Sequence, residues 1–162
     1  MAINQFDLEF VPTSCETPLD VDDNGHVYLC DERCMIWRRM PIERLTSEID
    51  AKFSAKESWS DNLLLWGSDR EILIKLWTED GRPDAVSARI AVNRLSVESL
   101  DRLLALASCF DCELYLREAQ TIIRPHRDVL LQYIATSTPY RFVKNPLAFF
   151  DQLSREPIEP LD

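Results

Sequence analysis

The chain has 162 residues, of which 46% are apolar, and its formal net charge is −10. This length suits one unit with a full core, so we expect residues 1–162 to form a single domain. An acidic chain lacks the cationic face that nucleic acids and anionic membranes attract, which argues against both as partners. No apolar run approaches the roughly 18 residues of a membrane span, and no secretory signal is expected at the start. Five cysteines in such a chain indicate reduced thiols and a cytoplasmic location.

The first third of the chain predicts short strands joined by polar turns. Residues 6–10 alternate apolar and acidic side chains, which is typical of a strand. Two prolines then make residues 12–25 an acidic loop, and further strands are expected at residues 26–29 and 34–37. Pro41 predicts the start of a helix, because apolar residues recur at helical spacing behind it.

The middle of the chain predicts a meander of three strands followed by a regular helix. The strands are expected at residues 63–66, 71–78 and 85–93, and a turn at residues 79–84 joins the last two. Ser96 is a good helix N-cap, and a continuous apolar stripe behind it predicts a helix that packs on the sheet.

The last third predicts two more strands and two more helices. A strand pair is expected at residues 113–116 and 121–123, a helix from Pro125, and a final helix capped by Asn145 with Pro146 in its first turn. Hairpin-linked strands with segregated helices predict an α+β fold, namely an antiparallel sheet with helices packed mainly on one face.

Acidic residues are concentrated at the start of the chain. Residues 1–32 carry eight acidic side chains and no Lys or Arg, and the acids expected to attract a basic partner are Asp20, Asp22, Asp23, Asp31 and Glu32. A solvated acidic edge without a partner is the alternative, since charge runs often have no specific role.

Trp66 and Trp77 are the aromatic candidates for a contact surface. If the second face of the sheet is only half covered, both rings could line a binding groove, because tryptophan is a favoured interface anchor. The alternative is that a helix covers that face and both rings belong to the core.

One segment matches the first half of a calcium-binding loop. Asp20, Asp22 and Asn24 occupy the first three ligand positions, Gly25 supplies the sharp turn, and Asp31 occupies the twelfth place. The twelfth ligand of such loops is normally a glutamate, and prolines upstream disfavour the entering helix. The alternative is an Asx turn between two strands.

Other chemistry has weaker support in the sequence. The pairs Cys30/Cys34 and Cys109/Cys112 have zinc-like spacing, but alternating strand faces and the lack of a glycine-rich knuckle favour buried core thiols instead. His126, at a helix start, could act as a general base in a hydrolase or transferase. Three glycines in 162 residues argue against a phosphate-cradling loop, and the usual catalytic motifs are missing. We therefore expect neither an enzyme nor a bound cofactor.

Three segments carry a resemblance to a known class of proteins. They are Leu63-Leu64-Leu65-Trp66-Gly67, Ser87-Ala88-Arg89-Ile90 and Tyr140-Arg141-Phe142-Val143-Lys144-Asn145-Pro146. They look like segments of small bacterial proteins of the immunity-protein type, which are acidic and cytosolic and block a toxin by direct contact. The resemblance implies a basic toxin domain as partner and assigns no binding residue.

The sequence thus predicts a non-enzymatic protein-binding module, and a homodimer is possible. A metal- or small-molecule-binding regulatory domain, centred on residues 20–31 or on the cysteines, is the alternative.

Overall fold

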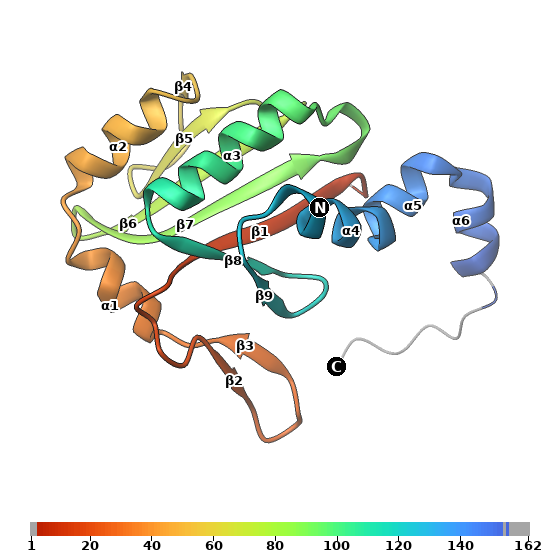
Figure 1. The fold of residues 1–162 in the computed structure, drawn as a ribbon, viewed down its shortest axis with the longest axis horizontal. Coiled ribbons are helices and arrows are strands. Elements are labelled where there is room, and N and C mark those ends of the chain that lie inside the picture. Colours follow the sequence, from red (N-terminus) through yellow and green to blue (C-terminus); the bar gives the residue numbers. More distant parts are fainter. Residues whose placement is uncertain (1–2, 154, 156–162) are drawn as a thin grey trace.

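The computed structural model describes residues 3–153 and Arg155, and these residues form the predicted α+β fold (Figure 1). A seven-stranded antiparallel sheet has the strand order β4-β5-β6-β7-β1-β8-β9, and β2 and β3 form a separate hairpin. The strands are β1 (Gln5–Pro12), β2 (Leu19–Val21), β3 (Val27–Leu29), β4 (Ala55–Lys56), β5 (Leu63–Gly67), β6 (Ile72–Glu79), β7 (Arg82–Ala91), β8 (Cys112–Leu116) and β9 (Thr121–Ile123). The helices are α1 (Glu32–Arg38), α2 (Ile42–Asp50), the 3-10 turn η1 (Val92–Arg94), α3 (Val97–Cys109), α4 (Arg127–Thr136), α5 (Thr138–Lys144) and α6 (Pro146–Leu153).

Helices cover one face of the sheet, and the strand register explains the core on that face. Phe6, Leu8 and Phe10 of β1 lie opposite alternate residues of β7, which in turn lie opposite alternate residues of β6. Because strand side chains alternate between faces, these residues form continuous apolar rows. The rows are Ile72–Ile90–Phe6, Ile74–Ala88–Leu8 and Leu76–Val86–Phe10, and every member is buried.

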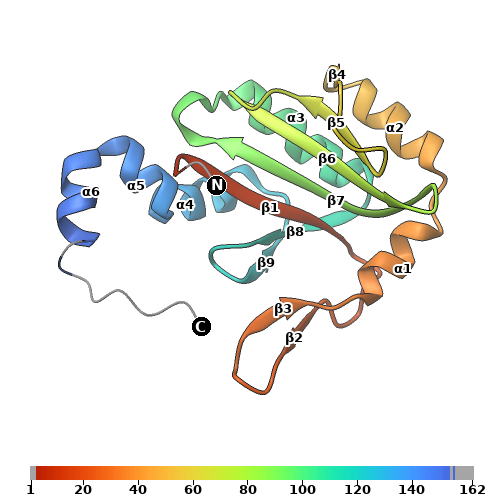
Figure 2. The same ribbon diagram turned by 180° about the vertical axis from the view of Figure 1, so that it is seen from behind.

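Helix α3 supplies the other half of this core, as its apolar stripe predicts. The Ser96 side chain accepts a hydrogen bond from the Ser99 main-chain N–H, which caps the first turn. Fully buried leucines of α3 then pack with apolar residues of α2 and α4 over the sheet. The two ribbon views show α3 in front of the strands and then behind them (Figures 1 and 2).

Strand β1 lies inside the sheet, although it comes first in the chain. It pairs with β7 on one side and with β8 on the other, so the connection from β7 through α3 to β8 passes over it. The central strand is therefore flanked by segments about 80 and 105 residues away in sequence. Turn signals in the sequence predict pairing only between strands that are consecutive in the chain, so they could not predict this strand order.

The hairpin between β6 and β7 is tighter than the predicted turn at 79–84. Glu79 pairs with Arg82, so the loop is only Asp80-Gly81, and both have positive φ (52° and 74°). Positive φ at both positions is typical of a type I′ turn, which suits the twist of a hairpin. The register shifts after Trp77, which opposes Ala85, while Thr78 opposes Pro83. This bulge leaves Asp84 free to bind Arg38 of α1, with Arg38 Nη2 2.8 Å from Asp84 Oδ1.

The prediction differs from the structure at four elements. Residues 34–37 form part of helix α1 instead of a strand, residues 19–21 within the predicted loop at 12–25 form β2, and neither β4 nor α5 was predicted. In α1, Trp37 is fully buried against the edge of the Phe110 ring, with ring centroids 6.1 Å apart. A short apolar run fits a strand and a short helix equally, and the contact with Phe110 exists only in the folded chain.

None of the helices within the described residues combines the length and the apolar character needed to traverse a bilayer.

The final helix begins as predicted, because the Asn145 side chain accepts a hydrogen bond from the Ala148 main-chain N–H at 3.1 Å. Of the apolar side chains on this helix, Leu147 is exposed, and those of Phe150 and Leu153 lie outside the described residues.

Replacing Gly67 with alanine should destabilise the fold more than the same change at Gly25. Both residues have left-handed φ, +84° and +81°, so either alanine meets about 1–2 kcal/mol of backbone strain. At Gly67 the added Cβ would also overlap the Ile72 carbonyl oxygen, whereas nothing lies within 4 Å of it at Gly25. Urea denaturation should therefore show a loss at least about 2 kcal/mol larger for Gly67→Ala. Equal losses in the two variants would contradict this close approach.

Candidate functional site

The face of the sheet opposite α3 is the candidate functional surface. Side chains that alternate with the core rows point to this face, and two cross-strand rows can be followed in the register: Leu73–Arg89–Asp7 and Lys75–Ser87–Glu9–Tyr115. Strands β6, β7 and β1 lie in front of α3 in Figure 2, with no helix over them. At one end of this face Leu19, Leu29 and Ile36 pack on Val11 and Tyr115, and near the β5–β6 side Leu63, Leu65 and Leu73 form a second buried cluster.

Six charged residues occupy the centre of this surface, and we call them the charged strip. They are Arg33, Lys75, Arg89, Arg117, Asp7 and Glu9. Two ion pairs hold the carboxylates: Arg89 Nε lies 3.1 Å from Asp7 Oδ1, and Arg33 Nε lies 2.9 Å from Glu9 Oε2. In the part of the chain that the structure describes, neither Lys75 nor Arg117 has an acidic partner within 4.0 Å. The charged strip therefore has an excess of positive charge on an otherwise acidic protein.

Burial shifts the ionisation of two members of the charged strip. Desolvation raises the pKa of Glu9 above 4.5, although the neighbouring Arg33 acts in the opposite direction. Desolvation also lowers the pKa of Lys75 below 10.5, and the positive charge of Arg89 adds to the effect. Both shifts mean that burial disfavours the charged forms of Glu9 and Lys75. A negative charge from a partner would stabilise the charged form of Lys75.

Two tryptophans stand at the β5–β6 side of the same face, and we call them the aromatic pair. Trp59 is 78% exposed and Trp77 is 37% exposed. Their ring centroids lie 6.4 Å apart in an edge-to-face arrangement. Trp77 lies opposite Leu63, which belongs to a small buried cluster with Leu65 and Leu73. The aromatic pair is thus a large exposed apolar surface next to a cluster of buried leucines.

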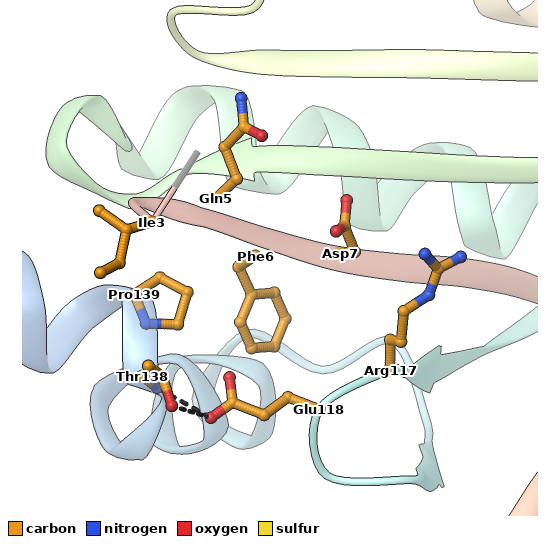
Figure 3. A pocket seen from close by; sticks show the side chains of 8 residues that line it. All are labelled: Ile3, Gln5, Phe6, Asp7, Arg117, Glu118, Thr138 and Pro139. Atoms are coloured by element: carbon orange, nitrogen blue, oxygen red, sulfur yellow. Dashed lines mark hydrogen bonds between the residues drawn. The ribbon is translucent and has the colours of Figure 1, made fainter. Parts of the chain in front are cut away.

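An apolar groove of about 440 Å³ lies where β1 extends beyond β8, and we call it the β1 groove (Figure 3). Ile3 lies next to Pro139 in this view, and the Phe6 ring lies beside Pro139 and above Glu118. Glu118 accepts hydrogen bonds from the Thr138 main-chain N–H (2.9 Å) and hydroxyl (2.6 Å), which fastens α5 to the turn after β8. The residues that line it are Ile3, Gln5, Phe6, Asp7, Arg117, Glu118, Thr138 and Pro139.

The predicted acidic residues lie mainly on the β2–β3 hairpin, which we call the acidic hairpin. Asp20, Asp22 and Asp23 are exposed there, whereas Asp31 and Glu32 are exposed at the start of α1. The acidic hairpin projects from the body of the protein below the sheet in Figure 1. It also exposes two apolar side chains, Val21 and Tyr28.

The segment that resembles a calcium loop forms an Asx turn. Asp22 Oδ1 accepts hydrogen bonds from the main-chain N–H groups of Asn24 (2.8 Å) and His26 (2.9 Å), and these bonds lower the pKa of Asp22. Asp22 Oδ2 lies 3.1 Å from His26 Nδ1. Both carboxylate oxygens therefore have partners within the turn, and Asp31 lies apart as the residue that precedes α1.

The prediction that Trp66 lines a groove was wrong. Trp66 is buried on the helix-covered face, and its indole N–H donates a hydrogen bond to Asp50 Oδ1 at 2.7 Å. Trp77 lies on the opposite face, as predicted. Leu63, Leu64, Leu65 and Trp66 are all apolar, so alternation could not show which residues of β5 face the core.

The cysteines and His126 do not converge on a common centre. All five thiols are free, and the described residues contain no group of three or more His, Cys, Asp or Glu side chains able to hold a metal ion. Cys15 and Cys112 are buried, and burial raises the pKa of each thiol. His126 is exposed at the start of α4, beside a polar hollow whose lining includes Ser108, Asp111 and Glu113.

Comparisons with protein-family models, with curated proteins and with solved structures found no match for this chain.

Most of the candidate surface was not predicted from the sequence. Alternation in residues 6–10 already places Asp7 and Glu9 on the face away from the core, and alternation in β7 does the same for Arg89. The sequence does not reveal that β1 pairs with β7. This pairing brings Asp7 and Arg89 together across 82 residues. The β1 groove carries no sequence signal, because α5 contributes to it only after folding.

Replacing Arg33 with methionine should make stability strongly dependent on pH. Glu9 and Arg33 have side-chain exposures of only 12% and 15%, so the variant leaves a buried carboxylate without its partner, at a cost of about 3 kcal/mol near pH 7. Loss of Arg33 raises the pKa of Glu9 further, so the folded protein holds this proton more tightly than the unfolded chain. Stability should then fall as pH rises from about 4.5 through the folded pKa.

Thermal unfolding between pH 4.5 and 8 measures this dependence. The double variant Arg33→Met/Glu9→Gln should lose the extra pH dependence, because its buried group no longer ionises. A pH profile of Arg33→Met parallel to that of the wild type would contradict the proposed role of this ion pair.

Proposed function

We propose that this chain is a non-enzymatic protein-binding module. The exposed aromatic pair is the observation that carries the proposal. Tryptophan is enriched among the residues that dominate binding energies, because it buries a large rigid surface when a partner covers it. Trp59 and Trp77 pack against each other, so their rings lose little further freedom when a partner binds.

The acidic hairpin supports a partner with a basic surface. It carries three exposed carboxylates next to the exposed Val21 and Tyr28. Mixed apolar and acidic side chains on a projecting segment suit contact with a cationic protein, and long-range attraction would speed association. A basic toxin domain fits this chemistry, and under this proposal the chain acts as an immunity protein that neutralises a toxin by direct contact.

The test is capture of a partner from the cells that express the gene, with immobilised wild-type protein and matched variants. Trp59→Ser/Trp77→Ser should reduce capture at least tenfold, because central aromatic anchors are each worth about 2 kcal/mol or more. Leu147→Ser is the control, since Leu147 is an exposed apolar residue on α6, outside both surfaces. Loss of capture in the control as well, or in none of the variants, would contradict the proposal.

The acidic hairpin is tested separately with Asp20→Asn/Asp23→Asn, which leaves the Asp22 turn intact. This double variant should slow association and weaken its dependence on salt, with a smaller effect on dissociation. For the immunity interpretation, the variants are expressed together with a toxin encoded by a neighbouring gene. Wild type should protect the cells and the tryptophan variant should not.

A further inference from the structure

Near its start, strand β1 is paired on one side only, although the strand lies inside the sheet. A further binding site follows from this unpaired edge. Strand β1 pairs with β7 from Gln5 onward, but its pairing with β8 begins only at Leu8. Beyond that point the chain turns away through Arg117 to Gln120, and the β1 groove occupies the position where a strand would continue. Figure 3 shows the N-terminal part of β1 with α5 below it and no strand between them.

The main chain of Gln5 faces this groove. Asp7 accepts a hydrogen bond from Arg117 N–H on the β8 side (3.3 Å), whereas Asn4 accepts one from Val92 N–H on the β7 side (3.1 Å). Successive residues of a strand direct their main-chain groups to opposite neighbours. The N–H and C=O of Gln5 therefore point to the same side as those of Asp7, where β8 has already ended. No main-chain group of the described residues bonds to Gln5 there.

The side chains around the groove define the chemistry of its occupant. Ile3, Phe6 and Pro139 offer apolar walls, so an apolar side chain fits between them. Asp7 Oδ1 pairs with Arg89, while Asp7 Oδ2 is buried without a hydrogen-bond partner among the described residues. Glu118 accepts hydrogen bonds from Thr138 and keeps its negative charge. Arg117, which also belongs to the charged strip, has no acidic partner within 4.0 Å among the described residues. The unpaired charge at the Arg117 end of the groove is thus positive.

We propose that the β1 groove binds an extended segment of a partner protein, which adds as a short strand beside Gln5. The segment places an apolar side chain against Phe6 and Pro139 and an acidic side chain near Arg117. Strand addition supplies affinity through main-chain hydrogen bonds, while side-chain pockets supply selectivity. This inference rests on the proposed protein-binding function and assigns it a second contact, separate from the aromatic pair.

A second copy of this chain is a poorer occupant for electrostatic reasons. A symmetric dimer brings residue i of one copy against residue j of the other. If two β1 edges paired antiparallel about Gln5, Arg117 of each copy would approach Ile3 and Asn4 of the other, which carry no carboxylate. A partner segment with a carboxylate supplies the opposite charge that Arg117 lacks.

The experiment uses a random eight-residue peptide library displayed on phage, selected on the full-length protein. A synthetic peptide with the enriched sequence is then measured by fluorescence anisotropy against wild type and Gln5→Pro. Proline removes the N–H that faces the groove, and this N–H is not used in the pairing with β7. Gln5→Ala keeps the N–H and is the matched control. We expect Gln5→Pro to weaken binding at least tenfold and Gln5→Ala less than threefold.

Three further measurements keep the proposal testable if Gln5→Pro does not fold. Ile3→Asp introduces a charge at the exposed rim of the groove and should weaken binding of the acidic peptide at least tenfold. Hydrogen exchange on the wild-type protein should show slower exchange of the Gln5 amide when the peptide is bound. Arg117→Gln should weaken binding of the acidic peptide, and less so when its acidic residue is replaced by glutamine.

Several outcomes would overturn the proposal. These are a library that yields no apolar–acidic consensus, equal affinity for Gln5→Pro and Gln5→Ala, or amide protection away from β1. Self-association that disappears in Gln5→Pro would assign the groove to a second copy instead. Trp59→Ser/Trp77→Ser should still bind the peptide, so failure of this site is distinguishable from failure of the aromatic pair.

Discussion

The structure depends on one constraint: helices cover only one face of a seven-stranded sheet. Each strand must therefore present apolar side chains to one side and groups that tolerate water to the other. Strand β1 shows both consequences, with Phe6, Leu8 and Phe10 in the core and with Asp7 and Glu9 on the opposite face. Because β1 is central, these two carboxylates are largely shielded from solvent, and each requires a cation from another part of the chain.

This requirement explains how the charges of the protein are distributed. The chain is acidic as a whole, yet the charged strip contains four cations and two carboxylates. Two of the cations neutralise Asp7 and Glu9, and the other two, Lys75 and Arg117, have no acidic partner within 4.0 Å among the described residues. The excess acid is located elsewhere, and part of it lies on the acidic hairpin. The molecule therefore presents surfaces of opposite sign in different places, and each favours a different kind of contact.

Strand lengths decide where main-chain groups remain available. The outermost strands, β4 and β9, have two and three residues, which limits edge-to-edge association with other sheets. The open hydrogen-bonding position lies instead beside the central strand, because β8 ends before β1 does. Pro139 of α5 borders this position without bonding to it, so the groove keeps both an apolar lining and an unpaired strand edge.

Local physics in the sequence determined the fold class, every strand except β2 and β4, and helices α2, α3, α4 and α6. Alternation, N-caps and the Asp80-Gly81 turn act over a few residues, so they can be recognised without knowing the fold. Alternation along β6 also places Trp77 on the face away from the helices. Only the tertiary structure decided that β1 lies between β7 and β8, that residues 34–37 are helical, and that Trp66 belongs to the core. These outcomes depend on contacts between residues far apart in the chain, such as Trp37 with Phe110 and Asp7 with Arg89, and a local pattern carries no information about which distant surface it will meet.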